Sequence, residues 1–320
     1  MKVLTHTQAR QPRPQGIYLE KHKKPRGAVG YHMKEHAYFS KMKAISFQGA
    51  AGANSDLACR AMFPRMETVP CHGFEDTFRA VTDKRADLAM IPVDNTLAGR
   101  VADVHHLIPK GNLYIVGEYF LPIRMSLMGV PGTKLSDLKH VHSHVHALPQ
   151  CRKIIRELKL EQHVAADTAR AAEDVAKRQD KTHAAIAAPL AADIYKLKIL
   201  KDDVQDSEHN TTRFLVWSRD HHMPDQDSKT MMITSFMFRV RNIPAALYKA
   251  LGGFATNGVN ITKLESYVDE KFQVAQFLCD TEGHPRDRNL SLALEELDFF
   301  AEEIRMLGTY PAHEFRFEPR

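Results

Sequence analysis

Short apolar runs alternate with segments of helical periodicity along the first two thirds of the chain. The runs at 45–47 and 88–93 predict buried strands, and apolar positions spaced i, i+4 and i+7 within 74–81 predict a helix between them. Strands that alternate with helices are typical of an α/β fold, in which helices cover a parallel or mixed sheet. We therefore expect an α/β fold from residue 44 onward.

A second series of strands and helices follows, and its outline suggests a two-lobed arrangement. Strands are expected at 141–145, 163–166 and 183–188, each followed by a segment of helical periodicity, and the chain then returns through an apolar strand at 210–217. Two strand–helix lobes joined by a crossover have the outline of a hinged protein that binds a small ligand between its lobes.

The C-terminal part shows a different order of elements. Residues 221–228 have the composition of a linker, and the segments after them predict a compact βαββαβ unit of the ferredoxin-like type. The expected strands lie at 234–240, 261–266, 272–278 and near Leu307, and the expected helices at 244–257 and about 289–305. The chain is therefore expected to comprise an extension (1–43), a first domain (44–220), a linker (221–229) and a C-terminal domain (230–320).

Positive charge is concentrated in the N-terminal extension. Residues 1–43 contain ten Lys and Arg side chains against two acidic ones, whereas the remainder of the chain has 34 against 37. The net charge of +5 therefore comes from the extension, and bulk electrostatics do not favour nucleic-acid binding by the folded body. Prolines and the lack of an apolar period predict that the extension is flexible, although an Arg-rich start is also a feature of organelle transit peptides.

Composition argues against several other classes of protein. No apolar run approaches the roughly 18 residues of a membrane-spanning helix, and the N-terminus lacks the apolar segment of a secretory signal. We therefore expect a cytoplasmic protein that does not bind membranes. The four cysteines are far apart and form no CxxC pair, which argues against disulfides and against a thiolate zinc site. They are expected to be buried free thiols.

Two polar groups are candidates for binding or chemistry. The polar residues 94–96 (DNT) follow a buried strand, and ligands of open α/β sheets bind beyond the carboxyl ends of the strands. His142, His144 and His146 alternate, so a strand would place their imidazoles on one face, where a zinc ion could bind. Because no acidic or cysteine partner lies at motif spacing, no metal site is assigned to them.

Five separated strings occur in an order that resembles the catalytic domain of prephenate dehydratase. They are FQGAAGANS at 47–55, ADLAMIPVDNTLAG at 86–99, VHSHVHALPQC at 141–151, DTARAA at 167–172 and NTTRF at 210–214. The segment 245–266 resembles the ACT regulatory domain of the same enzyme. The resemblance implies a two-lobed catalytic domain like that of periplasmic binding proteins, followed by a ferredoxin-like ACT domain.

This resemblance implies the decarboxylating dehydration of prephenate to phenylpyruvate in L-phenylalanine biosynthesis, without a metal or organic cofactor. Because aromatisation of the ring supplies the driving force, such an enzyme mainly orients its substrate and assists the departure of hydroxide. The family motif makes Thr212 the catalytic hydrogen-bond donor. The resemblance assigns substrate binding to Arg213 and Phe214 beside this threonine, to Asn95 and Thr96 of the DNT turn, and to Ser143 and His144 on the second lobe.

Departures from the family pattern bear on both halves of this interpretation. Asp94 stands where the family usually has glutamate, and Ala245 stands where the ACT motif usually has glycine. The resemblance implies feedback by L-phenylalanine and a homodimer or homotetramer formed through the ACT domains. The effector residues that it implies are Ala246, Leu247, Asn257, Glu265 and Ser266. Arogenate dehydratase and a non-catalytic amino-acid sensor are the alternatives, and the retained NTTRF and PVDNT strings argue against the sensor.

Overall fold

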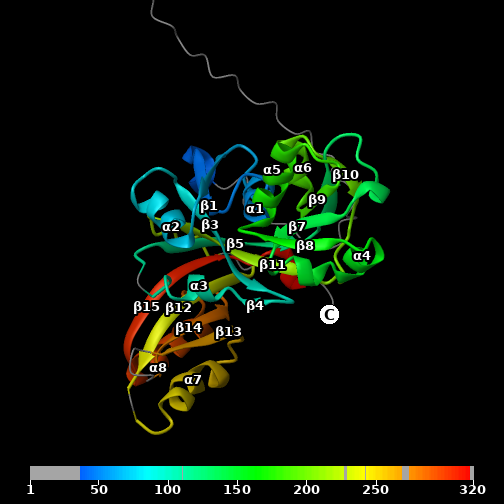
Figure 1. The fold of residues 1–320 in the computed structure, drawn as a ribbon. Coiled ribbons are helices and arrows are strands. Elements are labelled where there is room, and N and C mark those ends of the chain that lie inside the picture. The colour runs from blue at the N-terminus through cyan, green and yellow to red at the C-terminus, as the bar shows by residue number, and fades with distance from the viewer. Residues whose placement is uncertain (1–36, 110, 227–228, 242, 269–273, 318–320) are drawn as a thin grey trace, which may run out of the picture.

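The computed structural model describes residues 37–317 except 110, 227–228, 242 and 269–273, and these residues form two lobes and a C-terminal unit, each built on its own sheet (Figure 1). Most of the predicted flexible extension lies outside the described residues. Its last part belongs to the first lobe, because the 3₁₀ helix η2 (Ala37–Lys41) places Phe39 in the core, 5.2 Å from the ring of Phe63. The described fold thus begins before the predicted boundary at residue 44.

The first lobe is an α/β unit around a six-stranded sheet. The strand order is β2 (Glu67–Cys71), β1 (Ala44–Gln48), β3 (Leu88–Asn95), β11 (Thr211–Ser218) and β5 (Tyr114–Pro122), with β4 (Gly99–Arg100) beside β3. The pairs around β1 are parallel, and β11 runs antiparallel to both of its neighbours. The helices are α1 (Asn54–Met62), α2 (Phe74–Thr82) and α3 (Ala102–His105). The sheet is therefore mixed, which is one of the two arrangements that the periodicity predicted.

The second lobe has a five-stranded mixed sheet. Its order is β10 (Lys198–Lys201), β6 (Ser126–Gly129), β9 (His183–Ala187), β7 (His140–His144) and β8 (Glu161–Ala165). Strands β7, β8 and β9 are parallel, and α4 (Arg152–Glu157), α5 (Thr168–Arg178) and α6 (Pro189–Tyr195) connect or cover them. Short 3₁₀ helices lie at η3 (Leu135–Asp137) and η4 (Leu148–Gln150). The chain leaves the first lobe after β5 and returns to it with β11, which confirms the predicted crossover.

The C-terminal unit has the predicted βαββαβ order. It contains β12 (Met232–Val240), α7 (Ala246–Thr256), β13 (Ile261–Val268), β14 (Val274–Glu282), α8 (Arg288–Phe300) and β15 (Ala301–Pro311), followed by the 3₁₀ helix η5 (Glu314–Phe317). The strands pair antiparallel in the spatial order β13-β14-β12-β15. The helix predicted to reach residue 305 is wrong at its end, because α8 stops at Phe300 and the following eleven residues form β15.

Strands β12, β14 and β15 of the C-terminal sheet contribute side chains to cores on both faces. One face holds Phe236 and Phe238 in a core with α7 and α8. The other face contributes Ile233 and Tyr310 to a core that also contains Trp217 of the first lobe. A side chain at Gly308 would collide with the carbonyl of Ile115 in β5, so this close approach of two strands requires glycine. The C-terminal unit therefore shares a core with the first lobe.

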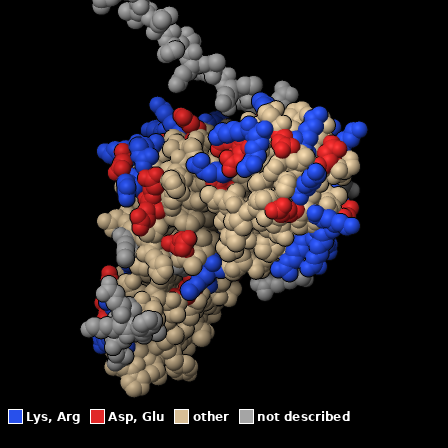
Figure 2. Space-filling model, in the orientation of Figure 1, with Lys and Arg blue, Asp and Glu red and all other residues tan. Residues whose placement is uncertain are grey.

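The surface and the cysteines agree with a folded body of mixed charge. Figure 2 shows acidic and basic side chains intermixed on this face of the two lobes. All four cysteines are buried free thiols, as predicted. No helix within the described part of the chain is long and apolar enough to cross a membrane.

Candidate functional site

Thr212 and Asn95 lie side by side on adjacent strands of the first lobe. They occupy paired positions of β11 and β3, and the Asn95 Nδ2 donates a hydrogen bond to Thr212 Oγ1 at 2.9 Å. Thr212 is 9% exposed, and Asn95 is partly buried at the point where β3 ends. The predicted proximity of the TRF threonine and the DNT turn is therefore present in the structure.

The orientation of the Asn95 amide follows from the tight turn after β3. Its Oδ1 accepts hydrogen bonds from the backbone N–H groups of Leu97 and Ala98, at 3.0 and 2.8 Å. The amide nitrogen must then face the opposite direction, where it donates to Thr212 and to Asn210 Oδ1. Because Thr212 Oγ1 accepts from Asn95, its own hydrogen remains available as a donor. Within the described residues, no acceptor lies at hydrogen-bond distance from it.

A chain of hydrogen bonds extends from this pair to the second lobe. Asn210, which is buried, receives the second N–H of Asn95 at 2.8 Å, and its own Nδ2 donates to Gln150 Oε1 at 2.7 Å. Gln150 is the last residue of η4, which follows Ser143 and His144 of β7 in the chain. Neither Asn210 nor Gln150 was named from the sequence, although both lie in the NTTRF and VHSHVHALPQC strings. Because each lies inside a sequence string that resembles the family, the strings themselves could have identified them.

The two lobes also touch on the side of the first glycine-containing loop. The Tyr195 hydroxyl donates to the Ala51 carbonyl at 2.8 Å. Gly52 has a positive φ of 89°, and a Cβ there would lie 2.9 Å from the backbone of Ala191. Glycine is needed at this position for both reasons, because other residues rarely adopt this φ and a side chain would push the lobes apart. The loop therefore fixes the approach of the lobes.

Thr96 connects the first residue of β11 to the DNT turn by hydrogen bonds. Its hydroxyl donates to the His209 carbonyl at 2.8 Å and accepts from the Thr211 N–H at 2.9 Å. The backbone N–H of Thr96 also donates to the Thr211 carbonyl. These bonds hold the turn against the strand that carries Thr212, so the hydroxyl of Thr96 is occupied by backbone groups.

Ser143 and His144 lie at the end of β7, but they face different surroundings. Ser143 is fully buried and donates to the Ile186 carbonyl at 2.6 Å, which directs its side chain into the second lobe. His144 is partly buried, and its Nδ1 accepts from the His146 N–H. Burial and then the nearby His146 lower the pKa of His144, against an opposing effect of Asp167. Of this pair, only His144 has a side chain that faces away from the lobe interior.

Arg213 points to the opposite face of the sheet from Thr212, because successive residues of a strand alternate. Its guanidinium lies 2.8 Å from Asp280 of β14 and 3.0 Å from Glu118 of β5, and it donates to the Tyr310 hydroxyl. Burial alone would lower the pKa of Arg213, but Asp280, Tyr310 and Glu118 raise it well above its usual value. These partners occupy the guanidinium that was predicted to bind substrate, and they join the first lobe to the C-terminal unit.

Phe214 returns to the face that carries Thr212. It is 1% exposed and lies in the core that extends from the first lobe into the second. The side chain of Phe214 therefore packs in the core. The three residues of the TRF string differ in their surroundings: Thr212 has a hydroxyl whose hydrogen is available, Arg213 forms buried ion pairs, and Phe214 is a core residue.

A cavity of about 370 Å³ lies between the DNT turn, β13 and η5. Lys263 of β13 reaches Asp94 of the turn at 2.6 Å and also lies 2.9 Å from Glu265. The other residues that line the cavity are Asn95, Thr96, Phe120, Thr211, Arg213, Thr262, Phe315 and Arg316. Asp94 is thus in contact with a lysine of the C-terminal unit, and the next residue is the one that orients Thr212.

The five predicted effector residues fall into two places of the C-terminal unit. Ala246 and Leu247 begin α7, and Asn257 caps its C-terminus, with its Nδ2 donating to Gly253 O and to Glu296 Oε1. Glu265 and Ser266 lie on β13, where Ser266 is exposed. The α7 group and the β13 pair thus lie on different elements of the unit.

The three alternating histidines do not form one cluster. The rings of His144 and His146 lie 5.2 Å apart, whereas the ring of His142 stacks on His163 and its Nε2 lies 2.8 Å from His183 Nδ1. The zinc site considered for the trio is therefore not present in the arrangement that the alternation suggested. Beyond His144 the chain leaves β7, so the period of a strand no longer applies.

Known proteins with similar sequences and structures share this architecture. A family model for prephenate dehydratase matches residues 45–222. The bifunctional N-acyl-homoserine lactone acylase/prephenate dehydratase of Komagataeibacter europaeus is 49% identical over 278 residues, which are 87% of this chain and 99% of that protein. The arogenate dehydratase/prephenate dehydratase 1 of Arabidopsis thaliana is 38% identical, over 83% of this chain and 71% of its own length. A solved prephenate dehydratase from Arthrobacter aurescens, in complex with L-Phe, is 28% identical with a TM-score of 0.78, covering 87% and 92% of the two chains.

Proposed function

Because the chain belongs to the prephenate dehydratase family, we propose that it converts prephenate to phenylpyruvate, carbon dioxide and water, as its motifs predicted. The observation that carries this proposal is the donor arrangement around Thr212, in which Asn95 donates to the hydroxyl and leaves its hydrogen free. In this reaction the C–C bond to the ring carboxylate and the C–O bond to the ring hydroxyl both break. The departing oxygen gains negative charge, and a fixed donor stabilises that charge most in the transition state.

The surroundings of Thr212 suit this role in a further way. A hydroxyl that accepts a hydrogen bond becomes a stronger donor, because bonds in a chain polarise one another. Thr212 lies at one end of such a chain, with Asn95, Asn210 and Gln150 behind it. Threonine does not transfer its proton fully, since its hydroxyl is a weak acid. The departing hydroxide becomes water by taking up one net proton from the buffered solution. The proposed role of Thr212 is therefore transition-state hydrogen bonding.

We assign the substrate to the face of β11 that carries Thr212, between the two lobes. His144 and Gln150 of the second lobe are the proposed partners on the far side, and Asn95 contributes from the first. Arg213 acts in the proposal by holding β11 against the C-terminal unit, because its guanidinium is buried among Asp280, Glu118 and Tyr310. In this proposal Thr212, on one face of β11, acts in catalysis, and Arg213, on the other face, holds the first lobe against the C-terminal unit.

Two other activities have support from named relatives. Arogenate has the same ring with a transaminated side chain, and the Arabidopsis relative is named for both substrates. The Komagataeibacter relative is named for lactone acylase activity as well as prephenate dehydration. The three reactions differ in product, so the same purified protein distinguishes them: phenylpyruvate by its absorbance in alkali, L-phenylalanine by chromatography, and homoserine lactone by release from its acyl chain. Turnover of arogenate alone or of the acyl lactone alone would reject the proposed substrate, and no product from any of the three would favour an amino-acid sensor.

The mechanistic part of the proposal is tested at Thr212. Thr212→Val removes the hydroxyl at nearly constant shape, and it should lower kcat by about a hundredfold or more while KM changes little. Thr212→Ser retains the donor, so it should keep most of the activity. Equal kcat in the valine variant and the wild type would exclude Thr212 from the reaction. Equal losses in both variants would show that shape, and not the hydroxyl, matters at this position.

We further propose that the C-terminal unit is an ACT domain that binds L-phenylalanine and inhibits turnover. The support is the βαββαβ order, the motif residues at both ends of α7 and on β13, and the L-Phe complex of the Arthrobacter relative. The contact between Lys263 and Asp94 provides a physical route from β13 to the turn that orients Thr212. Isothermal titration with L-phenylalanine, beside inhibition assays at the same concentrations, tests both statements.

A further inference from the structure

Four histidines gather on one face of the second-lobe sheet, at the start of its parallel strands. His140 and His142 alternate on β7, so their side chains share a face. In the register of the sheet, His163 of β8 lies opposite His142, and His183 of β9 lies opposite His140. Glu161 lies opposite His140 on the other side, two residues before His163. Five groups that can act as metal ligands are thereby brought together from three strands.

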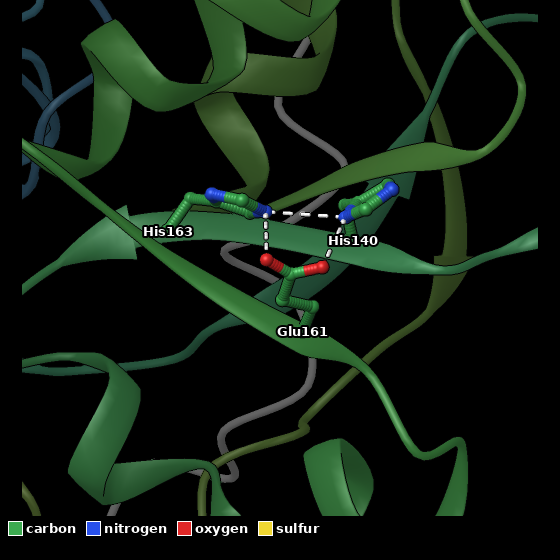
Figure 3. A group of neighbouring side chains, drawn as sticks. All are labelled: His140, Glu161 and His163. Carbon is green, nitrogen blue, oxygen red and sulfur yellow. Dashed lines mark hydrogen bonds and ion pairs between the residues drawn. The ribbon is translucent and has the colours of Figure 1, made fainter.

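Three of these side chains converge on one point (Figure 3). His140 Nδ1 lies 3.1 Å from His163 Nε2 and 3.2 Å from Glu161 Oε2, and His163 Nε2 lies 3.7 Å from Glu161 Oε1. Zinc ligands at bond lengths near 2.0–2.1 Å stand about 3.3 Å apart at the corners of a tetrahedron. The three measured separations are close to that value. A single ion between the two ring nitrogens and the Glu161 carboxylate, whose two oxygens each face one ring, would therefore need only small movements of the side chains.

We propose that His140, Glu161 and His163 form a binding site for a divalent zinc ion. Two imidazoles and a carboxylate are a donor set that zinc accepts, and three protein ligands leave the fourth position for water or another ligand. Glu161 has 66% of its side chain exposed, and His140 and His163 have 27% and 37%, so an ion can enter from solvent without unfolding the lobe. The site joins β8, which is the edge strand of the sheet, to its neighbour β7.

The other two histidines hold the ligand rings in place. The ring of His183 stacks on His140 at 4.4 Å between centroids, and the ring of His142 stacks on His163 at 4.7 Å. His142 and His183 also contact each other through their ring nitrogens at 2.8 Å. The two ligand imidazoles are therefore supported from behind by a linked pair, which is the function of outer groups around metal sites.

The site is separate from the proposed active site. His140 begins β7 and His144 ends it, and four strand residues span about 13 Å. Zinc binding is consequently expected to stabilise the second lobe without taking part in turnover. Its test does not depend on the identity of the substrate.

Direct hydrogen bonding is the competing explanation for the same contacts. A neutral imidazole has one donor and one acceptor nitrogen, so a proton shared between His140 and His163, with Glu161 accepting, would also bring these atoms together. The two explanations differ in one measurable property, which is the affinity for a metal ion that replaces the shared protons.

The experiment uses the full chain after dialysis against a chelator. Zinc chloride is titrated calorimetrically, and Co²⁺ is added in parallel because four-coordinate cobalt has a strong visible absorption. The wild type should bind one zinc ion per chain at micromolar affinity or tighter, above the weaker binding expected of a chain with 18 histidines. Glu161→Gln and His163→Gln should each weaken this strongest site by at least about tenfold and remove the cobalt spectrum. The exposed His72 is the matched control, and His72→Gln should leave both signals unchanged.

Thermal unfolding provides a second readout. Because a ligand that binds only the folded state stabilises it, zinc should raise the Tm of the wild type and of His72→Gln but not of the two ligand variants. Equal zinc affinity in the wild type and both ligand variants would overturn the site, as would the absence of a one-to-one component in the wild type. In either case the cluster would be a hydrogen-bonded histidine group.

Discussion

At the scale of single residues, one amide determines what the Thr212 hydroxyl can do. Asn95 Oδ1 is held by two backbone N–H groups, so its Nδ2 has a fixed direction toward Thr212. A carboxylate of the same shape would keep the contacts of Oδ1 but would present an acceptor to the threonine. The threonine would then donate inward, and its hydrogen would no longer be available to a substrate.

Asn95→Asp is therefore expected to lower kcat by about a hundredfold while the protein stays folded. The expected change is in kcat more than in KM, because the lost donor acts on charge that develops in the transition state. Steady-state kinetics with prephenate measures it. Asn260→Asp makes the same chemical change at an exposed position and should be without effect. Full activity of Asn95→Asp would contradict the proposed direction of the Thr212 hydrogen bond.

Ala245, which stands where the family pattern usually has glycine, has a strained backbone conformation. It precedes α7 with a φ of 60°, in the left-handed region where the ACT motif usually has glycine. A side chain at such a φ costs about 1 kcal/mol. Ala245→Gly should accordingly raise the free energy of unfolding by about that amount, measured by urea titration followed by circular dichroism. Ala255→Gly, an exposed position inside the same helix, should instead lower it by about 1 kcal/mol. A loss of stability in Ala245→Gly would show that the left-handed position is not strained.

The sequence strings that resemble the family predicted some positions of the candidate site and not others. Thr212, Asn95 and Thr96 came together as expected, because all three lie at the ends of neighbouring strands. The alternation of a strand already implied that Thr212 and Arg213 face opposite sides. The sequence could not reveal that Asp280 and Tyr310, far along the chain, would fill the second side and occupy the guanidinium. Side-chain partners from distant segments are fixed only by tertiary structure.

At the scale of elements, periodicity located most helices and strands but misplaced several boundaries, above all the end of the last helix. The segment after residue 300 continues a helical pattern, with Glu302 and Glu303 exposed. It forms β15 because it pairs along its length with β12 and meets β5 of the first lobe at Gly308. These contacts join residues far apart in sequence, so local pattern cannot anticipate them. The histidine cluster is a similar case, because β7 supplies two members and β8 and β9 supply the rest.

Strand β13 contacts the DNT turn through Lys263, and this contact predicts that a substitution can separate L-phenylalanine binding from inhibition. Lys263→Met removes the charge that contacts Asp94 and Glu265 but keeps a long side chain. Turnover without effector should change by less than about threefold, and L-phenylalanine binding should remain. The inhibition should weaken by at least about fivefold, the lower range of typical coupling between sites. Calorimetry and inhibition assays measure the two effects.

Lys249→Met is the control, because Lys249 is an exposed lysine of α7 in the same unit. It should retain both binding and inhibition. If Lys263→Met were inhibited at the same L-phenylalanine concentrations as the wild type, the contact between Lys263 and Asp94 would not carry the effect. Loss of L-phenylalanine binding in that variant would instead place Lys263 in the effector site itself.

At the scale of the whole molecule, the shared core makes the C-terminal unit part of one folded body. Tyr310 and Ile233 pack with Trp217, and Arg213 forms its ion pairs across the same boundary. The sequence predicted the order of elements in the C-terminal unit. It did not predict that side chains of this unit would pack with Trp217 of the first lobe. A unit fixed in this way can transmit a change in β13 to the first lobe, since packed cores respond as a whole.

The C-terminal unit also carries apolar side chains that the single chain leaves uncovered. Tyr248 on α7 and Phe299 on α8 are 82% and 74% exposed, and Leu264 and Val268 are exposed on β13, an edge strand of its sheet. Exposed apolar groups on the edge strand of a sheet favour association with a matching surface. We predict that two copies pair along β13, which would bring Glu265 and Ser266 to the interface.

Light scattering after gel filtration should give a mass of at least twice 36.3 kDa for the wild type. The double substitution Leu264→Glu and Val268→Glu places two like charges on this edge, and it should yield particles of half the wild-type mass, because burying them against a copy costs several kcal/mol. Leu135→Glu with Val164→Glu makes the same change at exposed positions of the second lobe and should keep the wild-type mass. Tyr248→Glu with Phe299→Glu tests the helices: if this pair alone separated the copies, association would use α7 and α8, and the edge of β13 would be free in the assembled protein.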